Sequence, residues 1–133
     1  MTAISRVLGA LAMSLALVAQ ADELPPSAAR AETAYLLAFV EASDCGFYRN
    51  GTRYDGVRAG SHLRDKYGLI VAPDHVLTTA AFIEKVASRS SMTGRPYEVS
   101  CAGQERVPLG PWLREALARY KTNGAPRESR GAR

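Results

Sequence analysis

Four stretches of the chain place apolar residues at the three- and four-residue spacing of an amphipathic helix. They cover residues 28–42, 56–67, 78–88 and 112–121. This spacing gathers the apolar side chains on one side of each helix, where they can be buried. The four predicted buried faces are formed by Leu36, Phe39 and Val40; Ala59, Leu63 and Tyr67; Phe82, Ile83, Val86 and Ala87; and Trp112, Leu113, Ala116, Leu117 and Tyr120.

A hairpin is predicted between the first two helices, in the segment CGFYRNGTRY of residues 45–54. Asn50-Gly51 lies there between residues that are typical of strands. This pair favours a two-residue turn, because both turn residues must adopt a positive φ. Such a turn sets Phe47 opposite Tyr54, and both side chains then point toward the core.

Two further strands follow the third helix. Residues 97–101 have the composition of a strand, and residues 105–107 predict a short fourth one. The chain is therefore expected to be an α+β domain, with about four helices packed on a small three- to four-stranded antiparallel sheet that contains the Asn-Gly hairpin.

The helix ends have signals of their own. Asp55 is expected to cap the second helix, and Gly68 is expected to end it. Thr78 or Thr79 is expected to cap the third helix.

The N-terminus resembles a secretory signal peptide over residues 1–21. A single basic residue, Arg6, precedes an uncharged apolar run, and Ala19-Gln20-Ala21 provides small residues for cleavage before Asp22. A membrane anchor is the alternative, but the run falls short of the ~20 residues that span a bilayer. The mature protein is therefore expected in the periplasm, without a transmembrane segment.

The remaining chain divides into three parts. Residues 22–27 are expected to be a flexible lead-in, residues 28–121 a single domain, and residues 122–133 a disordered basic tail. The formal net charge of +4 is carried in part by that tail. Without the signal peptide and the tail, residues 22–121 carry a formal net charge of only +1. They have no basic stripe with interleaved aromatic residues, so nucleic acid is not an expected partner.

The two cysteines, Cys45 and Cys101, are expected to form a disulfide, as is usual in a small exported domain. If they lie opposite each other in the sheet, Val99 lies beside Phe47 and Tyr97 lies beside Arg49. A metal site formed by the two thiolates is the alternative. It needs further ligands, and His62 and His75 have no suitable spacing, so no metal or cofactor is expected.

Several motifs resemble the YfeK-like family, small exported bacterial proteins with a domain of unknown function. They are FYRNG, SHLRDKYG and FIEKVASRSSMTGRPYEV. The resemblance covers residues 47–99 and extends more loosely to Trp112 and Tyr120. It implies export and a single compact domain, and it assigns no catalytic residue.

His62 is the candidate catalytic residue. On the second helix it shares a face with Arg58, Asp65 and Lys66, and Asp65 is the acid that could orient its imidazole. The adjacent Ser61 points about 100° away on a helix, so it cannot act as the nucleophile of this histidine without help. The alternative is a structural histidine that packs against the hairpin or bonds to the backbone.

A candidate binding patch consists of Arg49, Asn50, His62, Arg95 and Tyr97. The predicted register brings Arg49 and Tyr97 together, and the result would be a cationic, aromatic-edged surface suited to a carboxylate or a glycan. The alternative is that Arg49 stacks on Tyr97 as ordinary cation–π packing.

No complete catalytic constellation is recognisable in the sequence. The leading hypothesis is therefore a non-catalytic binding or structural protein of the bacterial cell envelope, whose partner is an unknown envelope protein or glycan. The alternative is a small envelope hydrolase that uses His62 with an acidic partner.

Overall fold

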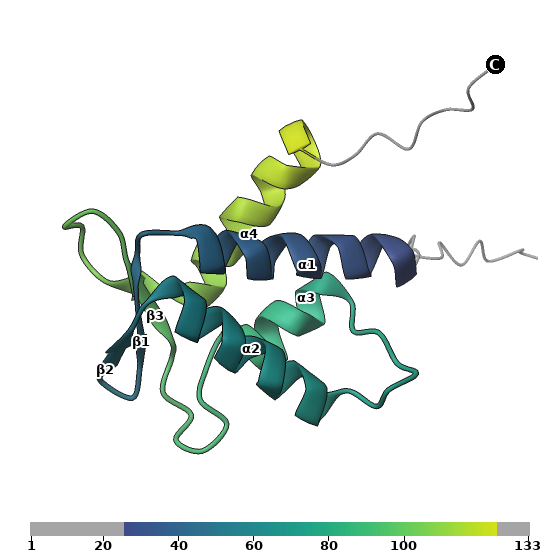
Figure 1. Cartoon of the computed structure of the whole chain (residues 1–133), viewed down its shortest axis with the longest axis horizontal. Coiled ribbons are helices and arrows are strands. Elements are labelled where there is room, and N and C mark those ends of the chain that lie inside the picture. Colours follow the sequence, from purple (N-terminus) through teal and green to yellow (C-terminus); the bar gives the residue numbers. More distant parts are fainter. Residues whose placement is uncertain (1–25, 125–133) are drawn as a thin grey trace, which may run out of the picture.

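The computed structural model describes residues 26–124, which form four helices and a four-stranded antiparallel sheet (Figure 1). The predicted signal peptide and most of the predicted lead-in and basic tail lie outside these residues. The helices are α1 (Pro26–Ala42), α2 (Gly56–Ile70), α3 (Thr79–Phe82) and α4 (Leu109–Arg119). Helices α3 and α4 are each continued by a π-helical turn. These turns are η1 (Ile83–Ala87) after α3 and η2 (Tyr120–Gly124) after α4.

The predicted apolar faces form a single core. Nearly all of their residues are buried or packed against buried residues, as the spacing required. The fully enclosed members include Leu36, Val40, Phe82, Ile83, Val86 and Leu113. The α+β class and the helical faces are therefore confirmed.

The first two helices are longer than predicted. Helix α1 begins at Pro26, inside the predicted lead-in, because proline is well suited to the first turn of a helix. Helix α2 continues through Gly68 to Ile70, so the prediction that Gly68 ends it was wrong. Val71 caps the helix with an extended backbone two residues before Pro73, and its amide donates to the carbonyl of Tyr67.

Because Gly68 lies within α2 without a positive φ, the Gly68→Ala variant should be stabilised by about 0.5–1 kcal/mol. A Cβ atom at this position would meet no other atom within 4 Å. Gly56→Ala is the matched control, because its Cβ would collide with the carbonyl oxygen of Val40 and should cost about 1–3 kcal/mol. Urea unfolding measures both changes, and effects of the same sign would contradict this account.

The third helix begins as predicted and then changes its form. Thr78 is its cap, since its hydroxyl accepts a hydrogen bond from the amide of Ala81 at 3.1 Å. After one α-helical turn the chain widens into η1 rather than remaining α-helical to Ser88. Ser88 then donates its hydroxyl to the carbonyl of Ile83 at 2.6 Å.

The sheet has the strand order β2-β1-β3-β4 and is antiparallel throughout. Its strands are β1 (Gly46–Arg49), β2 (Thr52–Tyr54), β3 (Glu98–Ser100) and β4 (Val107–Pro108). Phe47 pairs with Tyr54 on one side and with Val99 on the other, so the predicted register is confirmed. The fourth strand begins at Val107, where the prediction had it end.

The turn and the disulfide hold this register at its two ends. Asn50 and Gly51 both adopt a positive φ, 50° and 83°, in the turn between β1 and β2. Cys45 and Cys101 form the predicted disulfide directly beside the paired residues Gly46 and Ser100. Both thiols are therefore used in a covalent bond and cannot serve as metal ligands.

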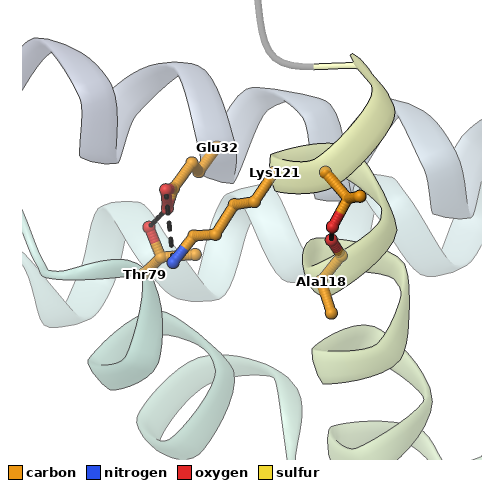
Figure 2. A network of polar contacts seen from close by, with 5 residues as sticks. Glu32, Thr79, Ala118 and Lys121 are labelled. Atoms are coloured by element: carbon orange, nitrogen blue, oxygen red, sulfur yellow. Dashed lines mark hydrogen bonds and ion pairs between the residues drawn. The ribbon is translucent and has the colours of Figure 1, made fainter.

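A buried polar network joins the end of the described chain to its beginning (Figure 2). Glu32 of α1 is only 5% exposed. Its carboxylate accepts a hydrogen bond from the hydroxyl of Thr79 at 2.7 Å, and the ammonium of Lys121 lies 3.7 Å from it. The carboxylate is thereby paired, and it links α1 to α3 and η2.

Candidate functional site

Four polar side chains meet where the hairpin, α2 and the start of β3 come together. They are Arg49 of β1, His62 and Lys66 of α2, and Tyr97 immediately before β3, and we call them the cationic cluster. Nη1 of Arg49 lies 2.9 Å from Nδ1 of His62, and Nε2 of the same ring lies 3.1 Å from the hydroxyl of Tyr97. The ammonium of Lys66 donates to this hydroxyl at 3.3 Å.

The local structure explains why these residues meet. Arg49 and Tyr97 each lie one residue beyond the paired residues Tyr48 and Glu98, so the register of β1 and β3 brings them to the same end of the sheet. His62 and Lys66 are four residues apart on α2 and therefore share one face of the helix. That face packs against the end of the sheet.

The alternative in which Arg49 stacks on Tyr97 was wrong. The guanidinium of Arg49 lies over the ring of Tyr54 at 5.4 Å, while the ammonium of Lys66 lies over the ring of Tyr97 at 5.0 Å. Arg49 turns toward α2 because the imidazole of His62 offers it a hydrogen-bond acceptor.

The shorter contact of Arg49 favours one tautomer of His62. A guanidinium can only donate, and its Nη1 lies 2.9 Å from Nδ1 against 3.3 Å from Nε2, which favours an accepting Nδ1 and a protonated Nε2 that donates to Tyr97. Burial lowers the pKa of His62, and the charges of Arg49 and Lys66 lower it further against the opposing effect of Asp65. The ring is therefore neutral near pH 7.

Lys66 is a buried cation. Its side chain donates to the carbonyl of Arg89 at 2.6 Å as well as to Tyr97, and the residue is only 8% exposed. Burial lowers the pKa of Lys66, and the charge of Arg49 lowers it further. Within residues 26–124, no carboxylate forms an ion pair with Lys66 or Arg49.

The cluster separates two hollows, and Arg49, His62 and Tyr97 line both of them. The smaller hollow, of about 140 Å³, lies between the hairpin and α2 and has mostly apolar walls. The larger hollow, of about 420 Å³, also includes Lys66 and reaches the loop after η1. Its volume lies in the range of about 300–1,000 Å³ that is common for small-molecule sites.

The structure brings together three of the five residues of the predicted binding patch, namely Arg49, His62 and Tyr97. Asn50 lies on the wall of the larger hollow, where its side chain bonds to Ser90 and Thr93. In the described part of the chain, the side chain of Arg95 lines neither hollow.

Lys66 was not predicted as a site residue. Its spacing of four residues from His62 was visible in the sequence, but a lysine on an amphipathic helix usually faces solvent. Its burial depends on the loop after η1, which supplies the carbonyl of Arg89.

Residues 27–121 match a protein family that is described as "Family of unknown function (DUF5329)". This range contains the whole cationic cluster. The chain belongs to this family. An uncharacterized protein, YfeK, from Salmonella typhimurium is 44% identical over 64 residues, which are 48% of this chain and 52% of the relative. The match thus spans about half the length of this curated relative. No solved structure matches the chain.

Among residues 26–124 of this family member, no helix is both long enough and apolar enough to cross a bilayer.

Asp65 does not act as a partner of His62 in this geometry. The two residues lie three apart on α2, but the hydrogen bonds of the imidazole go to Arg49 and Tyr97. Across residues 26–124, no carboxylate bonds to this ring. The arrangement therefore does not favour an acid–histidine pair for hydrolysis, and what the cluster offers chemically is a set of hydrogen-bond donors.

Proposed function

We propose that this protein is an exported, non-catalytic binding protein that captures an anionic group at the cationic cluster. Export is supported by the sequence of residues 1–21 and by the disulfide, which is typical of oxidising compartments. Binding is supported by the donors of Arg49, Lys66 and Tyr97, which line the larger hollow.

One observation carries the proposal. Lys66 is almost fully buried, next to Arg49, and neither has an ion-pair partner among the described residues. A buried charge is costly unless it is paired. A bound anion would supply the missing charge and would offset part of this cost.

The chemistry of the cluster favours a carboxylate over a neutral sugar. Arg49 and Lys66 have only donors, and the hydroxyl of Tyr97 already accepts from His62 and Lys66, so its own hydrogen is available to a ligand. Burial raises the pKa of Tyr97, so this hydroxyl keeps its proton at neutral pH. Hydrogen bonds between charged donors and a carboxylate are also roughly twice as strong as neutral ones.

The test is an NMR titration of the protein with acetate, the smallest stable monocarboxylate probe. Arg49→Leu should weaken acetate binding at least about tenfold, since a hydrogen bond to a charged group contributes about 1.5–3 kcal/mol. Arg95→Leu is the matched control, because it removes the same charge from an exposed residue outside both hollows.

The two variants have the same net charge, so a difference between them reports the site rather than the overall field of the protein. Arg95→Leu should bind acetate within about twofold of the wild type, as expected for a screened surface charge. Equal losses in both variants, or no loss in Arg49→Leu, would contradict the proposal. Circular dichroism checks whether both variants remain folded.

A further inference from the structure

Three exposed apolar side chains surround the larger hollow beside the cationic cluster. They are Leu69 and Ile70, at the end of α2, and Met92, in the loop after η1, and we call them the apolar rim. Leu69 is 88% exposed and Met92 is 95% exposed. Only two other large apolar residues between 26 and 124 are comparably exposed, so most such exposure is gathered at this hollow. Exposed apolar groups that cluster in this way mark interaction sites.

The polar wall of the same hollow is bonded within itself. The amide of Asn50 donates to the hydroxyl of Ser90, and the hydroxyl of Thr93 donates to the amide oxygen of Asn50 at 2.6 Å. Ser90 and Thr93 belong to the loop after η1, which Figure 1 shows beside the hairpin and α2. Because these groups are already satisfied, the wall has little to offer the backbone of a peptide or the hydroxyls of a sugar.

The hollow also has an electrostatic limit. Asp65 contributes to its lining and is close enough to oppose the other charges in their effect on the pKa of His62. A second negative charge on a ligand would therefore be repelled. The hollow suits a single negative charge at the cluster and an apolar group over the rim.

We propose that the larger hollow binds a single-chain amphiphile, a monocarboxylate with an unbranched alkyl chain. Its head occupies the cationic cluster, in accordance with the proposed function on which this inference rests. Its alkyl chain lies over Leu69, Ile70 and Met92. The charge of the cluster and the apolar rim beside it both match this ligand class.

Calorimetric titration of the full mature chain with decanoate and acetate tests the inference, at concentrations at which decanoate remains monomeric. Decanoate should bind at least about tenfold more tightly than acetate, because each buried methylene group adds severalfold to the affinity. The variants Leu69→Ser and Met92→Ser should each lower this preference for decanoate severalfold. Both side chains are exposed, so neither change threatens the core.

Val57→Ser is the matched control. Val57 is also an exposed apolar residue of α2, 67% exposed, and it lies outside both hollows. It should leave the preference for decanoate unchanged. A loss of preference in Val57→Ser as large as that in the rim variants would overturn the inference.

Two further probes separate this inference from the proposed function. If acetate and decanoate bind equally and both depend on Arg49, the inference of an amphiphilic ligand is overturned, whereas the proposed anion site is supported. If decanol binds as tightly as decanoate, and Arg49→Leu does not change decanoate binding, the anion site fails while an apolar site remains. If a tripeptide with a free C-terminal leucine binds more tightly than decanoate, the inference that the ligand has an alkyl chain is overturned.

Discussion

Replacing both cysteines with alanine should lower the free energy of unfolding by about 4 kcal/mol. Cys45 and Cys101 are 56 residues apart, and the bond between them restricts the unfolded chain across that whole separation. The loop-closure entropy for this length corresponds to about 4 kcal/mol near room temperature. Urea unfolding of the wild type and of the double variant measures the difference.

Reduced wild-type protein is the control for this experiment. It lacks the covalent bond but retains both sulfur atoms, so its stability should match that of the double alanine variant. A difference of less than about 1 kcal/mol between oxidised and reduced protein would mean that the bond does not act mainly on the unfolded chain.

Phe82→Ala should be almost as destabilising, with a loss of about 3–5 kcal/mol. Phe82 is fully buried at the junction of α3 and η1, and its ring packs edge-on against Tyr67 with the ring centres 5.8 Å apart. Removing the ring leaves a cavity that helices on several sides cannot close. The loss is measured by urea unfolding at a fixed temperature.

Val57→Ala provides the comparison for Phe82→Ala. Val57 is a large apolar residue of α2 but is 67% exposed, so its truncation should change the stability by no more than about 0.5 kcal/mol. If the two variants lost similar stability, Phe82 would not be the buried core residue described above.

The sheet could be predicted from the sequence because short-range and covalent constraints agree. The Asn50-Gly51 turn sets Phe47 opposite Tyr54, and the disulfide places Val99 beside the same Phe47. A shift by one residue would move every apolar side chain of the sheet to the opposite face. The register therefore followed from a few residues.

The ends of elements were less predictable, since they depend on weak and competing local preferences. Gly68 resembles a helix stop, yet the chain stays helical to Ile70 because no left-handed conformation is needed there. The change from α3 to η1 likewise has no counterpart in the apolar pattern, which is fully satisfied by either helical form.

The cationic cluster could be predicted only in part. The register brought Tyr97 toward Arg49, but the position of α2 against the sheet is a tertiary property that the helical spacing does not contain. That position decides that Arg49 bonds to His62 and that Lys66 is buried beneath the loop after η1. Lys66, whose burial carries the proposed function, therefore resembled an ordinary surface lysine in the sequence.

The ion pair of the buried Glu32 with Lys121, together with the stacked rings of Tyr35 and Tyr120 at 4.2 Å, holds η2 against α1. Both ends of the described chain thus leave the domain away from the hairpin (Figure 1). A protein immobilised through either end would present the hairpin to the surrounding solution.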